Sequence, residues 1–510
     1  MNYDNAKVLL RISNLKQYFP LKKKGLFVKA NDGISLDIYE GEVFGLVGES
    51  GCGKSTLGRS LLQLYKQTDG RTMYYGKNLL DMAPEYAFDT IKHLDAKKKH
   101  MQETAARLEK EEAHYNGLSE EEKMHHKNAL DACRKEAHDA LLDVANLVGG
   151  LIVSDNLSEV KAAFLALYES AKQRKKCRDE LAILKLDHDD MQNRVDKQLK
   201  GASAAKLQNI AGKIENKKNE LAKMEAAVEE KQNAVEELRK KNRGHADFDK
   251  YEAYYDEGVD LARLKYDEMR LLRSDLQLIF QDPYSSLNPR MSVGQIISEG
   301  MKTHHLLAKN DSRTQDKVLS VMESCGLAPY FLHRYPHQFS GGQRQRIGIA
   351  RSLAVEPRFV VCDEAVSALD VSIQSQIINL LYDLREERNL TYMFITHDLS
   401  VVKYISDRIG VMYLGNMVEL AHSEDIFKKP LHPYTQALIT AIPTTDPDQD
   451  KELQILEGDI PSPVNPPKGC KFHTRCCYCT EVCRHAVPDW VELEPNHFVA
   501  CHHPLMEEEK

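Results

Sequence analysis

The chain has 510 residues, 29% of them charged, and its formal net charge at pH 7 is −8. That length allows two or three domains, and the charge gives no global electrostatic case for nucleic-acid binding. No apolar run approaches the roughly 20 residues that span a bilayer. The first residues lack the basic-then-apolar layout of a signal peptide. We therefore expect a protein that works inside the cell and leaves any membrane path to other chains.

A glycine-rich run follows an apolar strand pattern at residues 43–47 and precedes a helical pattern. It reads Gly48, Glu49, Ser50, Gly51, Cys52, Gly53, Lys54, Ser55 and Thr56. Between a strand and a helix, such glycines let backbone N–H groups converge on phosphate oxygens. The Lys54 ammonium then supplies charge at the β- and γ-phosphates, and the Ser55 hydroxyl reaches Mg²⁺. The sequence therefore predicts a site for a nucleoside triphosphate.

From about residue 82 to 266 the chain becomes rich in lysine, glutamate, alanine and leucine. Apolar residues in steps of three, four and seven form a heptad seam, which comprises Leu207, Ile210, Ile214, Leu221, Met224, Val228, Val235 and Leu238. With Gly201 as the turn, we expect two helices of about forty residues folded back as an antiparallel coiled-coil hairpin, ~50–60 Å long. Two interpretations of this segment stay open. It is either a solvated spacer or a docking arm for a membrane or cytosolic partner.

A second chemical element follows the apolar run 359–362, which leads into Asp363 and Glu364. The run is typical of a buried parallel strand, which delivers both carboxylates to its C-terminal edge. There Asp363 can hold Mg²⁺ through water, and Glu364 can polarise the attacking water. Two acidic residues after a strand are also typical of a helix N-cap. The phosphate loop in the same chain favours the catalytic interpretation.

These motifs, in this order, resemble those of the ATP-binding subunits of ABC transporters. The family's signature motif is similar to Ser340, Gly341, Gly342 and Gln343, and its D-loop to Ser367, Ala368, Leu369 and Asp370. The family commonly has proline after the catalytic glutamate, where this chain has Ala365. We expect that difference to change backbone rigidity slightly and to leave activity intact.

Three more residues take their expected roles from the same resemblance. Gln281 stands where the family has its Q-loop glutamine, a ligand of Mg²⁺, and His397 stands at the catalytic switch histidine. Phe19 stands where the family places an aromatic ring against adenine, with Tyr18 and Phe27 as competitors for that role.

Within the family the chain resembles the oligopeptide/dipeptide importers, on the runs 281–290, 431–435 and 461–467. The resemblance covers roughly residues 8–83 and 266–503. It implies an α/β fold, in which a P-loop nucleotide-binding domain is formed by residues 1–83 and 266–430. We expect a helical insertion at 84–265 and a small cysteine-rich C-terminal domain at 431–510.

Six of the eleven cysteines lie within residues 470–501. Cys470, Cys476, Cys483 and Cys501 stand at spacings that could enclose a metal, and Cys477 and Cys479 lie in the same loop. Four thiolates can bind tetrahedral Zn²⁺ or a [4Fe–4S] cluster, and spacing does not choose between them. The importer resemblance implies a [4Fe–4S] cluster on the first four cysteines. Zinc, unligated thiols and ligation by Cys477 or Cys479 stay open.

The resemblance also implies how such a protein works. Two ATP-binding subunits close around ATP and Mg²⁺, and the signature motif of one caps the nucleotide held by the other. We expect an ATPase on the cytoplasmic face of a prokaryotic cell membrane that powers import of peptides or similar small solutes. Its expected partners are a related second ATPase in a heterodimer, two transmembrane permease subunits and an extracytoplasmic solute-binding protein, with no nucleic acid. The alternative is a coiled-coil ABC ATPase of the DNA-repair or chromosome-maintenance type.

Overall fold

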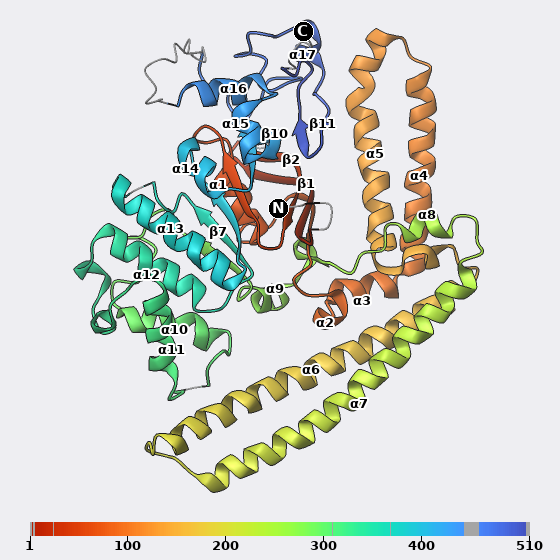
Figure 1. Ribbon diagram of the computed structural model, residues 1–510. Helices are drawn as coiled ribbons and strands as arrows, with labels where there is room; N and C mark the ends of the chain where they lie inside the picture. Colours follow the sequence, from red (N-terminus) through yellow and green to blue (C-terminus); the bar gives the residue numbers. More distant parts are fainter. Residues whose placement is uncertain are drawn as a thin grey trace. The chain divides into compact units, whose positions relative to one another are not determined.

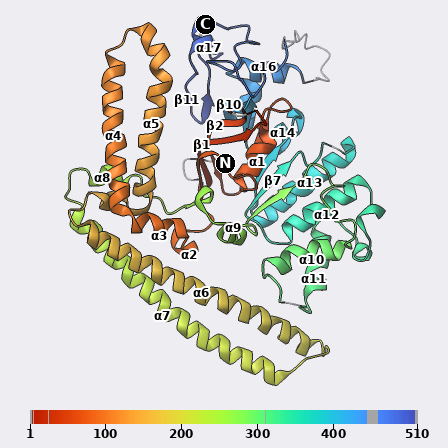
Figure 2. The same ribbon diagram turned by 180° about the vertical axis from the view of Figure 1, so that it is seen from behind.

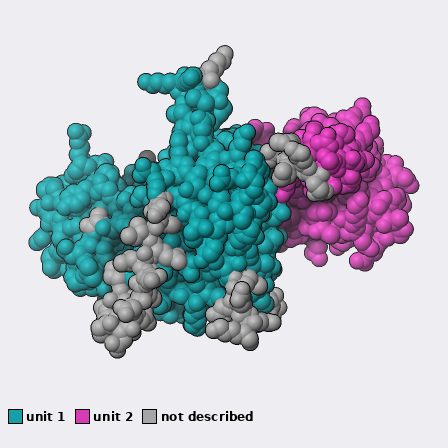
Figure 3. All heavy atoms as spheres, turned by 90° about the horizontal axis from the view of Figure 1, so that it is seen from above, with its two compact units in different colours: residues 1–76, 260–262, 269–510 teal, residues 77–259, 263–268 magenta. Residues whose placement is uncertain are grey.

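The computed structural model describes residues 3, 6–23, 25–308, 310–367, 369–442 and 458–505. The chain forms two compact units, which Figure 3 colours separately. Unit 1 comprises Met1–Gly76, Asp260–Ala262 and Met269–Lys510, and unit 2 comprises Lys77–Val259 and Arg263–Glu268.

An eight-stranded sheet forms the centre of unit 1, in the order β11-β12-β10-β9-β3-β8-β7-β6 (Figure 1). Its strands are β3 (Val43–Val47), β6 (Leu276–Ile279), β7 (Phe359–Asp363), β8 (Thr391–Ile395), β9 (Arg408–Tyr413), β10 (Asn416–His422), β11 (Val491–Glu494) and β12 (His497–Val499). The five strands from β9 to β6 pair in parallel. Every residue of β3, β7, β8 and β9 is buried, as expected for parallel strands covered on both faces.

Helices connect these strands and complete the hydrophobic core. They are α1 (Lys54–Leu61), α9 (Tyr266–Leu272), α10 (Val293–Thr303), α11 (Thr314–Ser324), α12 (Gly341–Leu353), α13 (Val371–Arg388), α14 (Leu399–Ile405), α15 (Ser423–Lys428), α16 (Pro433–Thr440) and α17 (Glu481–His485). Buried side chains such as Ile347 of α12 and Leu381 of α13 pack in one cluster with Val360 of β7. Parallel neighbouring strands need such crossover helices, which is why strand and helix alternate along this part of the chain.

A smaller sheet has the order β2-β1-β4-β5. Its strands are β1 (Val8–Pro20), β2 (Phe27–Tyr39), β4 (Asp69–Tyr74) and β5 (Val259–Asp260). β1 pairs antiparallel with both β2 and β4. β2 supports the loop before α1, because Asn31 Nδ2 donates a 3.1 Å hydrogen bond to the carbonyl oxygen of Gly53.

Unit 2 is helical. It contains α2 (Leu79–Met82), α3 (Glu85–Lys92), α4 (Leu94–Asn116), α5 (Glu120–Val148), α6 (Leu157–Asp196), α7 (Ala204–Asn242) and α8 (Phe248–Glu252). α4 lies antiparallel beside α5, and α6 beside α7, in the two opposite views of Figures 1 and 2.

The long pair has 40 residues in α6 and 39 in α7. Ile214, Val228 and Val235, which belong to the predicted seam, are buried. Lys217 interrupts that seam, and its ammonium reaches across to the Glu180 carboxylate of α6 at 2.8 Å. The flexible stem of a lysine lets its charge leave an apolar seam for a partner at the edge, so the two helices stay in contact there.

Candidate active site

The loop from Gly48 to Gly53 connects buried β3 to α1. Gly53 has a φ of 103°, and a Cβ there would lie 2.1 Å from the carbonyl oxygen of Ala30, so only glycine fits. The Lys54 ammonium donates to the carbonyl oxygens of Gly48 at 2.7 Å and Glu49 at 3.1 Å. The loop geometry therefore matches the phosphate cradle that the sequence predicts, with Lys54 folded back over it.

Asp363 ends β7 and is 1% exposed. Its Oδ2 atom pairs with the Arg59 guanidinium of α1 at 3.1 Å. Its Oδ1 atom is buried and has no hydrogen-bond partner among the described residues. A buried carboxylate oxygen without a donor is costly, and oxygen is the ligand that Mg²⁺ prefers. This residue therefore fits the predicted role of holding Mg²⁺ through water, which stays a prediction.

Glu364 lies beside two of the residues that the sequence predicts for the site. Gln281 Nε2 donates a 2.6 Å hydrogen bond to Glu364 Oε2, and His397 Nδ1 lies 3.5 Å from Glu364 Oε1. Glu364 has a φ of 46°, and its N–H donates to the carbonyl oxygen of Ile395. A non-glycine residue in this left-handed region is held there by its surroundings, a frequent feature of functional sites.

The predicted signature motif starts a helix. Ser340 is the N-cap of α12 and forms a reciprocal capping box with Gln343. A Cβ on Gly342 would lie 2.5 Å from Ile373 Cγ2 in α13, so this glycine permits close packing of two helices. No hydrogen bond or ion pair joins residues 340–343 to the phosphate loop in the parts of the chain that the structure describes. The first N–H groups of an α-helix have no partner within the helix, so the N–H groups of Gly341 and Gly342 give the motif an electropositive end.

The predicted D-loop lies between Glu364 and α13. Ser367 Oγ donates a 3.0 Å hydrogen bond to the carbonyl oxygen of Glu364. Leu369 reaches the signature motif, because a Cβ on Gly341 would lie 3.5 Å from Leu369 Cδ2. Asp370 is the N-cap of α13, and Ala368 lies outside the described residues. The predicted D-loop thus connects Glu364 to the N-terminal end of α12.

The candidate aromatics for adenine have different surroundings. Phe19 contacts Tyr65 edge-on, with ring centroids 5.2 Å apart. The Tyr18 hydroxyl donates to Asp32, and Phe27 is 44% exposed. The assignment of Phe19 to adenine stays a prediction.

The cysteines of the C-terminal segment gather around one place. Cys470 N–H donates to the carbonyl oxygen of Cys483 at 2.8 Å, and the sulfur of Cys501 interacts electrostatically with both. Burial, together with neighbouring cysteines, raises the pKa of Cys476 to about 12 and that of Cys501 to about 11. These thiols stay protonated at neutral pH unless a cation shares the site.

The spacing of these sulfurs bears on which group they could hold. Among the described residues, no three of them lie within 4.8 Å of one another. Sulfurs around one tetrahedral zinc ion are roughly 3.8 Å apart, from Zn–S bonds of about 2.3 Å. Which group these cysteines hold stays a prediction.

Three residues with contacts to the site were given no role by the sequence. Arg59 pairs with Asp363, Arg475 pairs with Glu49, and the Tyr434 hydroxyl accepts a hydrogen bond from the Glu49 N–H. Tyr434 belongs to a run that carries the importer resemblance, which could have pointed to it. Nothing in the sequence distinguishes Arg59 or Arg475 from other arginines.

Comparisons with known proteins find sequences that are similar to this chain. A family model described as ABC transporter matches residues 31–240 and 208–367, and one described as oligopeptide/dipeptide transporter, C-terminal region, matches 418–483. The oligopeptide transport ATP-binding protein AppF of Bacillus subtilis is 51% identical over 48% of this chain and 75% of its own length. The oligopeptide transport ATP-binding protein OppF of Salmonella typhimurium is 53% identical over 48% of this chain and 73% of its own length.

Among solved structures, the dimeric ATP-binding cassette MJ0796 bound to ADP and Pi matches with a TM-score of 0.42 and 16% identity. This match covers 81% of this chain and 99% of the MJ0796 chain. This TM-score and this identity are too low to support a family assignment. The family assignment rests on the sequence similarities alone. None of the described helices combines the length and apolar character that a membrane-spanning helix requires.

Proposed function

Because the chain belongs to the ABC transporter family of ATP-binding proteins, we propose that it is the ATP-hydrolysing subunit that powers peptide import through a membrane transporter. ATP-binding subunits of such transporters are ATPases. The observation that supports hydrolysis most directly is the convergence of Gln281 and His397 on Glu364, beside the unpartnered oxygen of Asp363. The match of residues 418–483 to the oligopeptide/dipeptide C-terminal region supports peptides as the cargo.

The proposed chemistry assigns one task to each residue. Lys54 and the loop N–H groups bind the phosphates, and Ser55, Gln281 and Asp363 would hold Mg²⁺. Bound Mg²⁺ neutralises charge that develops on the phosphate oxygens. Glu364 accepts a hydrogen bond from the attacking water and polarises it, while Gln281 and His397 fix the orientation of the carboxylate.

The signature motif is proposed to act on a second subunit. Among the described residues, no hydrogen bond or ion pair joins its electropositive helix end to the phosphate loop, so this end is available to cap a nucleotide from outside. We propose a heterodimer with a related ATPase, closed by ATP and opened by hydrolysis. Purified complex in which both ATP turnover and peptide uptake survive substitution of Ser340 and Gly341 would contradict this arrangement.

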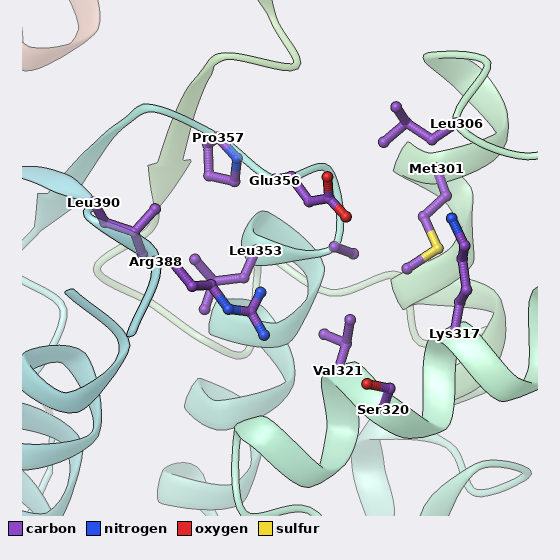
Figure 4. A pocket seen from close by; sticks show the side chains of 11 residues that line it. Met301, Leu306, Lys317, Ser320, Val321, Leu353, Glu356, Pro357, Arg388 and Leu390 are labelled. Atoms are coloured by element: carbon purple, nitrogen blue, oxygen red, sulfur yellow. The ribbon is translucent and has the colours of Figure 1, made fainter. Parts of the chain in front are cut away.

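A pocket of about 490 Å³ in unit 1 is a candidate contact for a permease subunit (Figure 4). Met301, Val321 and Leu353 give it apolar walls, and Lys317 and Arg388 add charge. Leu353 ends α12, which begins at the signature motif, and Arg388 ends α13, which begins after the D-loop. A permease segment seated here would therefore move both nucleotide-contacting motifs through two rigid helices.

Filling this pocket tests the proposed contact. Ser320 of α11 lines the pocket, whereas the neighbouring exposed Glu323 does not. In the assembled transporter, Ser320→Trp should abolish peptide uptake while nucleotide binding stays normal. The matched variant Glu323→Trp should preserve both. Normal uptake by Ser320→Trp would place the permease elsewhere.

The cysteine-rich segment is proposed to hold a [4Fe–4S] cluster on Cys470, Cys476, Cys483 and Cys501. The support is the shared location of these cysteines in the C-terminal segment. Anaerobically purified protein should contain iron and acid-labile sulfide in equal amounts, and each Cys→Ser variant should lose both. Stoichiometric zinc without sulfide would favour the zinc alternative, and neither element would favour free thiols. Retention of the cluster by the Cys477→Ser and Cys479→Ser variants would exclude these two residues as ligands.

We also propose the division of the chain into an ABC cassette at 1–83 and 266–430, an inserted coiled-coil arm at 84–265, and a C-terminal domain at 431–510. Replacing residues 182–215, the distal part of the α6–α7 pair, by a glycine-rich turn tests the arm. Lost uptake with normal ATP hydrolysis would indicate a docking arm, and normal uptake a spacer.

The proposed place of work is the cytoplasmic face of a prokaryotic membrane, with two permeases and an extracytoplasmic solute-binding protein. The similarities above do not favour the DNA-repair alternative, and no nucleic-acid partner is proposed. The overall test is ATP-dependent uptake of labelled peptides into vesicles that contain the assembled transporter. Nucleotide binding without any ATP-dependent peptide uptake would contradict the proposed function.

A further inference from the structure

Glu49 of the phosphate loop is contacted at all three of its polar groups. The Arg475 guanidinium forms a bidentate ion pair with the Glu49 carboxylate, at 2.8 and 3.1 Å. The Tyr434 hydroxyl oxygen accepts a 2.9 Å hydrogen bond from the Glu49 N–H, and Lys54 donates to the Glu49 carbonyl oxygen. Two of these three contacts come from the C-terminal region, more than 380 residues along the chain.

Arg475 belongs to a short segment whose other side chains also contact the surroundings of the loop. Lys471 Nζ lies 3.1 Å from both Asp32 Oδ2 and the carbonyl oxygen of Leu414. Phe472 is 2% exposed and packs edge-on against Tyr413. The Arg475 side chain is 5% exposed. A planar guanidinium held at both of its terminal nitrogens in such a place has little freedom to leave.

The charge of Glu49 explains why such a partner matters. This carboxylate lies in the loop that must receive the negatively charged phosphates. Left unpaired, it would repel them, because charges in a partly buried loop are poorly screened. Paired with Arg475, its charge is neutralised, and the loop stays electropositive through Lys54.

We infer that Arg475 and Tyr434 are positioning residues for nucleotide binding, so that the C-terminal region completes the phosphate loop. Arg475 neutralises Glu49, and Tyr434 fixes the backbone of that residue. Neither needs to touch the nucleotide. This inference rests on the proposed function as an ATP-binding subunit.

The test is a double-substitution cycle on the full-length protein, with the dissociation constant of a fluorescent ATP analogue as the readout. Arg475→Gln should weaken binding about tenfold, because Glu49 regains an uncompensated charge near the phosphates. Glu49→Gln added to that variant should restore affinity to within about threefold of wild type, because it removes the repulsion. Arg484→Gln, at an exposed arginine of the same region, should bind like wild type.

The affinities of the Arg475, Glu49 and Tyr434 variants decide whether these residues position the phosphate loop. Unchanged affinity in Arg475→Gln would overturn the inference, and so would weakened affinity that Glu49→Gln does not rescue. Tyr434→Phe supplies a second measurement, because it keeps the ring but removes the hydroxyl oxygen that accepts from Glu49. It should also weaken binding, and unchanged affinity would remove Tyr434 from the inference. Failure of the wild type itself to bind the analogue would overturn the proposed function instead.

A separate observation concerns unit 2. Glu111 and His114 lie one turn apart on α4, and His126 faces them from α5, with one ligand atom from each within 4.8 Å of the others. The two imidazole rings are 5.6 Å apart at 76°. The nearby Arg134 is already paired with Glu112 at 3.0 Å, so its charge is compensated. Two imidazoles and one carboxylate form a donor set that suits borderline divalent cations such as Zn²⁺.

We propose that Glu111, His114 and His126 bind a divalent transition-metal ion that fastens the end of α4 to α5. Both histidines are exposed, so water can supply the remaining ligands. Zn²⁺ titrated into full-length protein should bind with one equivalent more in wild type than in His114→Gln or His126→Gln. His100→Gln, at an exposed histidine of α4 outside the site, should keep the wild-type stoichiometry. Equal stoichiometry in all four proteins would overturn this proposal.

Discussion

Gln281 and Glu364 are joined by a 2.6 Å hydrogen bond from Nε2 to Oε2, although 83 residues separate them. Gln281 follows β6 and Glu364 follows β7, and these strands are parallel neighbours in the sheet. Because parallel strands end at the same edge, the two side chains meet there. The bond orients the carboxylate and leaves Oε1 toward His397. Gln281 thus contacts the glutamate for which we propose the catalytic role.

Glu364→Gln should preserve nucleotide affinity and lower ATP turnover at least about a hundredfold, the usual size of a general-base contribution. The amide keeps the shape of the side chain but accepts a proton far less readily. Steady-state phosphate release and equilibrium binding of ATP measure the two effects. A related partner ATPase could hydrolyse at its own site, so its catalytic glutamate is changed in the same complex. Glu424→Gln, at a surface carboxylate, is the control. Wild-type turnover would remove Glu364 from its role.

Much of this site could be predicted from the sequence because its chemistry depends on local motifs. The places of Gly53 and Lys54 follow from the strand, loop and helix that are adjacent to them in the sequence. The places of Asp363 and Glu364 follow from the strand that precedes them. Arg475 and Tyr434 could not be predicted, because their contacts with Glu49 depend on how the last segment folds over β9 and β10. The same holds for Arg59, whose partner Asp363 is 304 residues away.

The helices of unit 2 were predictable for a different reason. A heptad pattern with Gly201 between its halves sets both the length and the direction of α6 and α7. The pattern does not show which polar residues bridge the pair. In the sequence, Lys217 interrupts the apolar heptad seam. In the structure, its ammonium forms ion pairs with Glu180 and Glu220.

Lys54→Ala should weaken ATP binding roughly ten- to a hundredfold, the loss expected for hydrogen bonds to charged groups. The variant removes both the phosphate partner and the bonds that hold Gly48 and Glu49. Equilibrium binding of a fluorescent ATP analogue measures the change. Lys66→Ala, at an exposed lysine shortly after α1, should bind normally. Undiminished affinity in Lys54→Ala would show that the loop does not bind phosphates through this residue.

Arg408 and Glu42 form a buried ion pair that should contribute strongly to stability. Their side chains are 4% and 0% exposed, and the nitrogen–oxygen distances are 2.6 and 3.1 Å. Arg408→Met would leave the carboxylate unpaired and should lower the free energy of unfolding by about 3–5 kcal/mol. Arg11→Met breaks an exposed pair with Asp37 and should cost less than about 1 kcal/mol. Urea unfolding of both variants compares the two losses, and equal losses would contradict the argument.

His432 should make stability depend on pH. It is fully buried, its Nδ1 atom accepts a hydrogen bond from the Tyr434 N–H, and Glu419 lies nearby. Burial lowers the pKa of His432 to about 4, against the weaker opposite effect of Glu419. The unfolded chain has a histidine pKa of about 6.5. Between these values the unfolded state binds more protons, so the free energy of unfolding rises with pH.

The stabilisation from neutral His432 is therefore complete above about pH 6.5 and is lost as the pH falls toward 4, by up to ~3 kcal/mol. Urea unfolding at pH 7, 6 and 5 should show this decrease in wild type and a smaller one in His432→Asn, whose side-chain oxygen can still accept from Tyr434. His333→Asn, at an exposed histidine, should keep the wild-type slope. If His432→Asn retains the full slope as well, another group causes the pH dependence, and the buried imidazole is not the one that titrates on unfolding.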